Sequence, residues 1–213
     1  RVRSLTGIPN PHVVALENIL AAAKLKPVSF SLRMTALQPA GDKVTDGVVA
    51  LVIGESHVGL QITAAGGVTA LRALEGAVVD EGGHRMLHAD FVARETRITL
   101  GQLPAELRAL VKRIRIFGPR ELARQLADEL ELKFEPMGLQ TEVVAAYAPD
   151  EFGVQAPPDV PVTGAFSLAA RFLIEQKAVL EFLPPKPTFI EQLVVKYSSG
   201  RLRTAGAAGA VVV

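Results

Sequence analysis

The chain has no cysteine among its 213 residues, and aromatic residues make up only 5% of it. The absence of cysteine excludes a disulfide framework, a thiolate zinc site and a cysteine nucleophile, and it suits a reducing compartment. Few aromatic rings are present to stack on nucleic-acid bases. An excess of charge of one sign is also missing, since the formal net charge is +1. We therefore expect no nucleic-acid partner.

The C-terminus lacks a hydrophobic run of membrane-spanning length. The uncharged stretch 204–213 is about half of the roughly 20 apolar residues that such a helix needs. Lys196, Arg201 and Arg203 precede it. Three interpretations stay open: a truncated transmembrane helix with its basic flank in the cytoplasm, a buried strand that ends at Val213, or a Gly/Ala tail.

What the chain does contain is enough apolar material for a packed core, since 49% of its residues are hydrophobic and 21% are charged. The length suits one domain with an appendage. A proline-rich stretch at 148–164 is typical of a boundary loop. We expect a main domain at 1–178, followed by a juxtamembrane or partner-docking segment at 179–213.

Hydrophobic periodicity predicts the secondary structure. Helices are expected at 11–24, 86–100, from Pro104 to 113, at 119–134, 165–176 and 188–199. Strands are expected at 26–37, at 113–118, at 139–147, within 178–187 and three times within 48–74. Gly66 and Gly67 indicate a hairpin, because both tolerate the positive φ of a tight turn. Strands and helices in this order predict an α/β fold with a mixed sheet and flanking helices.

The stretch VVALVIGESHVGLQI (48–62) sets the main functional question, because its polar break is either a phosphate loop or a hairpin tip. Three further stretches stand in a characteristic order with it: ENILAAAKLKPVSFSLRMTAL (17–37), RIRIFGPRELARQLADELE (113–131) and LEFLPP (180–185). Together they resemble the second large domain of actin-like (ribonuclease H-like) ATPases. The resemblance is greatest to the PilM and GspL families, which are platform proteins of type IV pilus and type II secretion systems.

The resemblance implies a nucleotide site, and the sequence departs from it in two ways. The family places an acidic residue just before the glycine turn to help hold magnesium, whereas Val52 and Ile53 stand here. The paired glycines on the adenosine side are reduced to one, and the proline after it removes a backbone donor. Phosphate binding needs several backbone N–H groups and usually a cation. We expect a hairpin tip and a degenerate, non-catalytic nucleotide site without ATP, formed by Gly54, Glu55, Ser56, His57 and Gly118.

The apolar segment at 180–185 has two interpretations of equal weight. It is either an internal edge strand or a peptide offered to the groove of a partner by strand addition. The resemblance favours partner binding, because the segment is similar to the short peptide of PilN-type proteins that PilM grips. The candidate partner-binding residues are Leu180, Phe182, Leu183, Pro184 and Pro185.

Two other candidate sites are weaker. His84 and His88 are spaced to share one face of a helix and hold a metal ion, but a polar loop leading into a helix explains them more simply, and we expect no metal. Ser56 and His57 are adjacent in a strand and so point to opposite faces, which argues against a hydrolytic pair.

These observations favour a non-catalytic assembly platform over an enzyme. The resemblance places such a platform in the cytoplasm, associated with the inner membrane. It implies other platform proteins and the assembly ATPase as partners, and a homo-oligomer is compatible with the sequence. The alternative is an actin-superfamily ATPase or a kinase-like enzyme whose other nucleotide-binding half is missing from this chain.

Overall fold

A computed structural model describes residues 8–37, 46–157, 162–175 and 181–182. The chain divides into two units, 1–182 and 183–213, and the second lies outside the described residues. The helices of the first unit are α1 (Asn10–Ala22), α2 (Ala89–Gly101), α3 (Ala105–Leu110), α4 (Arg120–Phe134), α5 (Pro149–Phe152) and α6 (Gly164–Glu175), with short 3₁₀ helices η1 (Arg33–Leu37) and η2 (Glu135–Met137). The strands are β1 (Gly47–Ile53), β2 (His57–Ala64), β3 (Gly67–Glu75), β4 (Val78–Glu81), β5 (His84–Leu87), β6 (Val111–Phe117) and β7 (Gln140–Val143).

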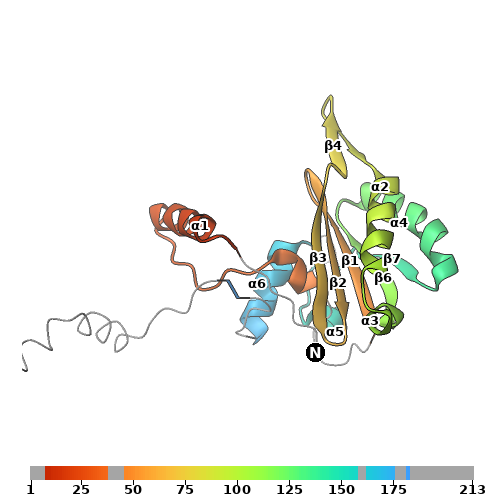
Figure 1. Cartoon of the computed structure of the whole chain (residues 1–213). Helices are drawn as coiled ribbons and strands as arrows, with labels where there is room; N and C mark the ends of the chain where they lie inside the picture. The colour runs from red at the N-terminus through yellow and green to blue at the C-terminus, as the bar shows by residue number, and fades with distance from the viewer. Residues whose placement is uncertain (1–7, 38–45, 158–161, 176–180, 183–213) are drawn as a thin grey trace, which may run out of the picture. The chain divides into compact units, whose positions relative to one another are not determined.

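A mixed five-stranded sheet organises the described unit, as the sequence predicts (Figure 1). Its strand order is β3-β2-β1-β6-β7. The first three strands form an antiparallel meander, and β1, β6 and β7 run parallel to one another. The parallel pairs need crossover connections, which the segments containing α2–α3 and α4 supply.

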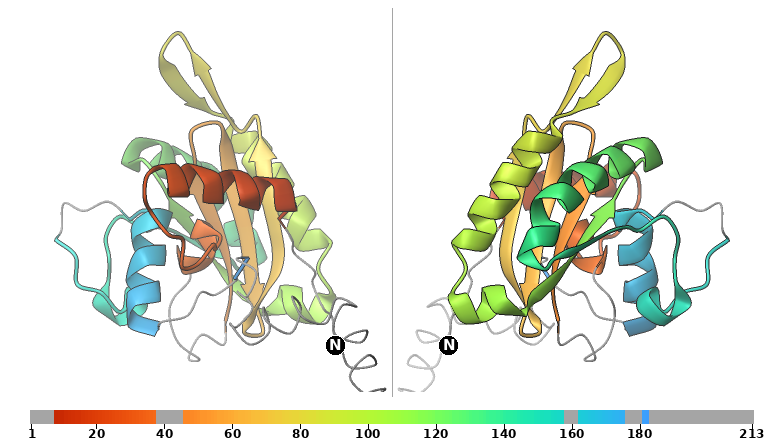
Figure 2. Two further views of the ribbon diagram at one scale, coloured as in Figure 1. Left: turned by 90° about the vertical axis from the view of Figure 1, so that its left-hand side faces the viewer. Right: turned by 90° about the vertical axis from the view of Figure 1, so that its right-hand side faces the viewer.

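The central strand β1 is buried on both faces. Val48, Val49, Ala50 and Leu51 are each at most 1% exposed. On one face, alternate residues of β1, β2 and β6 pack against α2 and α4, which lie side by side over the sheet (Figure 2). On the other face, Ala50 and Phe117 pack with Leu37 of η1 and with Tyr147 and Phe152.

The second face also carries an ion pair between a buried arginine and a half-exposed glutamate. Arg115 of β6 is 2% exposed, and its Nε lies 2.6 Å from a carboxylate oxygen of Glu142, its register partner on β7. The guanidinium lies 5.6 Å and 5.8 Å from the ring centroids of Phe117 and Phe152. A buried guanidinium requires such partners, because desolvation of an unpaired charge is costly.

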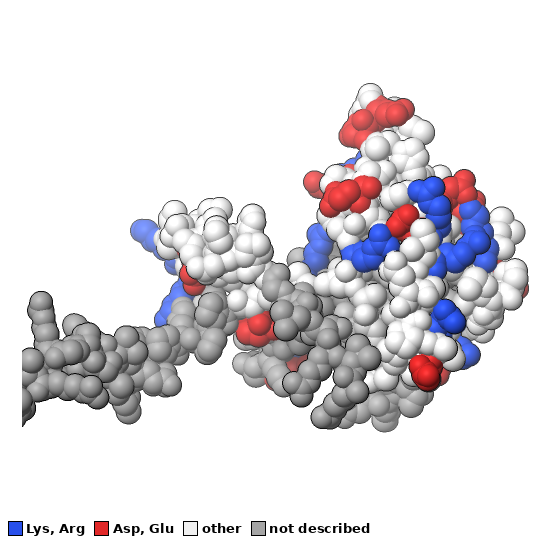
Figure 3. Space-filling view, in the orientation of Figure 1, with Lys and Arg blue, Asp and Glu red and all other residues white. Residues whose placement is uncertain are grey.

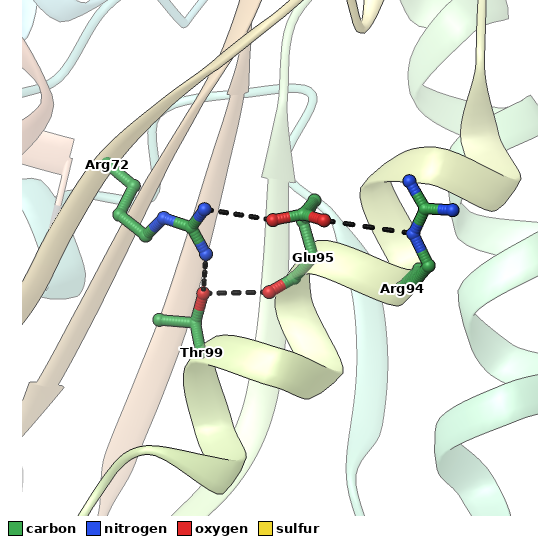
Figure 4. A network of polar contacts seen from close by, with 4 residues as sticks. All are labelled: Arg72, Arg94, Glu95 and Thr99. Carbon is green, nitrogen blue, oxygen red and sulfur yellow. Dashed lines mark hydrogen bonds and ion pairs between the residues drawn. The ribbon is translucent and has the colours of Figure 1, made fainter.

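The edge strand β3 is tied to α2 by a polar network (Figure 4). The two terminal nitrogens of Arg72 donate to the hydroxyl of Thr99 at 2.7 Å and to the carboxylate of Glu95 at 2.8 Å. Thr99 in turn donates to the backbone carbonyl of Glu95 at 2.7 Å. Arg94 approaches the same carboxylate at 3.7 Å. The network fixes α2 over the antiparallel side of the sheet.

Several predicted elements are confirmed and others are wrong. The helices at 119–134 and 165–176 and the meander within 48–74 are present, and the predicted strand at 113–118 is β6. The predicted strand at 26–37 is wrong, because its second half is the 3₁₀ helix η1 and its first half has no strand partner in the sheet. The turn between β2 and β3 is one residue earlier than expected, with positive φ at Ala65 and Gly66.

The largest error concerns 76–88. The predicted helix at 86–100 begins only at Ala89, and the preceding residues form the β4–β5 hairpin. Gly82 and Gly83 occupy its turn with φ of 63° and 83°, and the N–H of Gly83 donates to Asp80. The hairpin extends away from the main sheet (Figures 1 and 2).

The predicted strand 139–147 is reduced to Gln140–Val143, and the predicted helix 188–199 lies outside the described residues.

The packing of α4 predicts a large difference between two leucines of the same helix. Leu126 is 0% exposed, whereas Leu132 is 77% exposed. Leu126→Ala leaves a cavity in the core, so we expect it to lower the free energy of unfolding by about 2–5 kcal/mol. Leu132→Ala should change it by about 0.5 kcal/mol or less. Urea unfolding followed by circular dichroism measures both, and equal effects would contradict the assigned face of α4.

Candidate functional site

The two predicted halves of the nucleotide site lie next to each other. The tip at 54–57 joins β1 to β2, and Gly118 follows β6, which pairs in parallel with β1. The last register pair is Val52 with Phe117, so the chain leaves both strands at the same sheet edge. Ligands of α/β sheets bind at such carboxyl edges. Tertiary structure therefore unites two segments that are far apart in the sequence.

Gly118 is packed too tightly to carry a side chain. It has a φ of +148°, and a Cβ built on it would lie 2.8 Å from the Cβ of Ile53. This close approach joins the end of β1 to the start of α4. Gly118 is thus required by packing and backbone conformation, which accounts for it without a nucleotide.

Some of the backbone N–H groups at the tip are already hydrogen-bonded within the protein. The N–H of Gly54 donates to the carbonyl of His57 at 2.9 Å, closing the turn on itself. Pro119, next to Gly118, has no N–H. The side chain of Glu55 is 91% exposed, and its carboxylate lies 3.8 Å from Arg85 of the β4–β5 hairpin. A guanidinium nitrogen of Arg33 lies 3.6 Å from the position that a Cβ on Gly54 would take.

Chemically, this edge offers a phosphate little of what it needs. The N–H of Gly54 is used inside the turn, Pro119 has no N–H, and the exposed carboxylate of Glu55 repels an anion. Ser56 is exposed, whereas His57 is half-buried and pairs in register with Glu75 of β3. The tip therefore presents a closed turn rather than an open amide cradle, with the carboxylate of Glu55 facing Arg85 and the guanidinium of Arg33 near Gly54.

The two histidines weighed as a candidate metal pair are separated by the fold. His84 lies in β5, and His88 precedes α2 as its N-cap residue, so the two do not share a helix face. Among residues 8–37, 46–157, 162–175 and 181–182, no group of three or more potential ligands is placed to hold a metal ion.

Of the candidate partner-binding residues, only Phe182 lies within the described ranges. Its N–H donates to the carbonyl of Phe30 at 2.8 Å. The neighbouring Glu181 accepts from the N–H of Phe30 at 2.9 Å and from the hydroxyl of Ser29 at 2.5 Å. Residues 181–182 therefore lie alongside residues 29–30 of the same chain. Leu180, Leu183, Pro184 and Pro185 lie outside the described residues.

A cavity of about 850 Å³ lies elsewhere, between α2 and α4. We call it the α2–α4 groove. None of its lining residues belongs to the tip at 54–57, and Gly118 is not among them. It is lined by Gly76, Leu87, His88, Ala89, Asp90, Phe91, Arg94, Arg97, Gln125, Glu129 and Lys133.

Lys133 is the electrostatic link across this groove. Its ammonium donates to the carboxylate of Asp90 on α2 and lies 2.6 Å from that of Glu129, one turn earlier on α4. The hydrogen bond and charge of Lys133 hold the pKa of Asp90 below its usual range. The hydrogen bonds to Asp90 and Glu129 raise the pKa of Lys133. Sequence spacing reveals the Glu129–Lys133 pair, but only the packing of two helices brings in Asp90.

No helix in the described part of the chain is long and apolar enough to cross a membrane, and the basic and uncharged segment 196–213 lies outside the described residues. No protein-family model matches the chain, and a search of curated proteins finds no relative.

The close approach at the sheet edge predicts that Gly118→Ala is destabilising. A methyl group would meet Ile53 and would have to adopt an unfavourable φ, so we expect a loss of about 1–3 kcal/mol in the free energy of unfolding. Gly101→Ala is the matched control, because no atom lies within 4 Å of its added Cβ. Denaturant titration compares the two, and a harmless Gly118→Ala would refute the packing role.

The Asp90–Lys133 contact predicts a pH dependence. Because the folded-state pKa of Asp90 is lowered, its contribution to stability is present above the unfolded value of about 3.9. That contribution is lost as the pH falls through the lowered pKa. In Lys133→Met, the pKa of Asp90 should rise toward about 3.9. Carboxyl NMR titration measures it, with Lys112→Met as control; an unchanged pKa in Lys133→Met would contradict the contact.

Proposed function

We propose that this chain is a non-catalytic, actin-like assembly module of the PilM/GspL type. In this proposal it works in the cytoplasm at the inner membrane, where it holds platform proteins and the assembly ATPase of a pilus or secretion machine. The resemblance of the four ordered stretches motivates the proposal. The strand arrangement supports it, because the meander, β6 and α4 occur in the order that the resemblance implies.

The observation that carries the non-catalytic part is the construction of the sheet edge. Val52 and Ile53 stand where the family has an acidic residue before the glycine turn. The Cβ of Ile53 packs directly onto Gly118. The amide of Gly54 is bonded within the tip. A triphosphate with magnesium would need these groups to face it instead.

The binding role rests on a different observation. The N–H of Phe182 donates to the backbone carbonyl of Phe30, which is a single hydrogen bond of the kind that strand addition repeats, whereas Glu181 contacts Ser29 and Phe30 through its side-chain carboxylate. The backbone N–H of Phe182 thus binds a carbonyl of another backbone segment. We propose that the candidate partner-binding residues use this capacity toward a partner.

The alternative, an ATPase or kinase-like enzyme completed by a second half, is favoured by one specific observation. The tip at 54–57 and Gly118 converge at the carboxyl edge of parallel strands, where nucleotides bind in α/β folds. Binding measurements separate the two functions.

The test combines calorimetry with affinity capture on the full-length protein. With Mg-ATP we expect no binding tighter than a Kd of about 1 mM, equivalent to about −4 kcal/mol. Tighter binding would favour the enzyme. A tagged wild-type chain should recover pilus or secretion components from its own cells, and Phe182→Ala should recover less of them.

Leu132→Ala is the control for capture, because Leu132 is exposed and lies on α4 rather than near the Phe182 segment. Recovery that is equal for all three chains would argue against the role of Phe182. Recovery of no envelope component by the wild type would count against the platform itself.

A further inference from the structure

The β4–β5 hairpin stands apart from the five-stranded sheet, because within the described residues its two strands pair only with each other. An isolated two-stranded hairpin is marginally stable in water. Within it, Met86 is 48% exposed, although methionine is an apolar side chain. The hairpin extends away from the main sheet (Figures 1 and 2). These features are typical of a segment that contacts another surface, and we call the β4–β5 hairpin the arm.

The turn of this hairpin is acidic. Asp80 and Glu81 are exposed beside the glycine turn, and Glu75 and Glu55 are exposed near its base. Figure 3 shows acidic side chains at the upper end of the molecule, with basic side chains directly below them. Arg85 of the hairpin lies 3.8 Å from Glu55 and is the cross-strand register partner of Asp80, so the two carboxylates beside the turn outnumber one guanidinium.

The α2–α4 groove presents charge of the opposite sign. Its three basic side chains, Arg94, Arg97 and Lys133, outnumber Asp90 and Glu129. Lys133 is engaged by those two carboxylates. Arg94, which also lies 3.7 Å from Glu95, and Arg97 are exposed at the groove, and Figure 3 shows basic side chains over these helices.

The groove also has an apolar part. Phe91 and Leu87 line it, and the guanidinium of Arg94 lies 5.4 Å from the ring centroid of Phe91. The volume of about 850 Å³ is within the range of about 300–1,000 Å³ typical of sites that enclose a small ligand. A turn of a few residues with two carboxylates is a ligand of this kind.

A chain cannot place its own arm in its own groove. Gly76 and Leu87, at the base of the hairpin, are themselves lining residues, and the four-residue strands extend away from them. The two complementary features are therefore separated on one copy and available to different copies.

We propose that the acidic tip of the β4–β5 hairpin of one copy docks in the α2–α4 groove of a second copy. Asp80 and Glu81 accept hydrogen bonds from Arg94 and Arg97 of the next copy. Because the two surfaces differ, the contact is heterologous and assembles chains head to tail, as a ring or an open filament. This inference is independent of the proposed platform function.

The test uses charge exchange on the full chain, followed by sedimentation velocity over a range of protein concentrations. The tip variant is Asp80→Asn with Glu81→Lys, in which the amide oxygen of the introduced asparagine keeps an acceptor for the N–H of Gly83. The groove variant is Arg94→Glu with Arg97→Glu. We expect the wild type to associate, and to associate less as salt increases. Each variant alone should associate about tenfold or more weakly.

The decisive measurement is the mixture of the two variants. A basic tip fits an acidic groove and an acidic tip fits a basic groove, so mixing should restore association, as should one chain that carries all four substitutions. The control, Arg108→Glu with Lys112→Glu on α3 and β6, should behave as the wild type. A wild type that stays monomeric at every concentration, or variants whose mixture does not associate, would overturn the proposal.

Discussion

The double-sided burial of β1 is the constraint on which the rest of the fold depends. A strand that is buried on both faces needs a cover on each, and here α2 and α4 supply one while η1, Tyr147 and Phe152 supply the other. Its backbone also needs two neighbours, which are antiparallel β2 and parallel β6. Because β1 and β6 run in the same direction, their carboxyl ends meet, and this fixes the place where the tip at 54–57 and Gly118 come together.

That meeting point illustrates how packing and ligand binding compete for the same glycine. A glycine beside a strand end leaves room for a phosphate to approach the backbone. Here the Cβ of Ile53 takes up that room at Gly118. The same edge can thus serve as a rigid joint between the sheet and α4. A joint of this kind suits the proposed module, whose task is to hold surfaces in fixed positions.

The surfaces themselves are set by charge more than by apolar area. Arg72, Glu95 and Thr99 anchor α2 to the edge strand, while Lys133 links α2 to α4 through Asp90. These internal bonds leave Arg94 and Arg97 exposed at the groove, and the hairpin turn carries the opposite charge. The described unit therefore has carboxylates at the hairpin turn and exposed guanidinium groups at the α2–α4 groove, which are the charges that the proposed head-to-tail contact would use.

The sequence alone determined the elements whose signals are local. The apolar residues of 120–134 recur with helical spacing, and the continuous apolar run at 48–53 is typical of a buried strand. Both elements can therefore be predicted without knowledge of the tertiary structure. The hairpin at 78–87 was missed because its strands are short and its polar residues mimic a loop before a helix. The predicted strand at 26–37 failed because alternation is not sufficient without a partner strand. Only tertiary structure decided that Gly118 meets Ile53 and that Asp90 meets Lys133, since contacts between distant segments depend on the register of the sheet and the packing of helices.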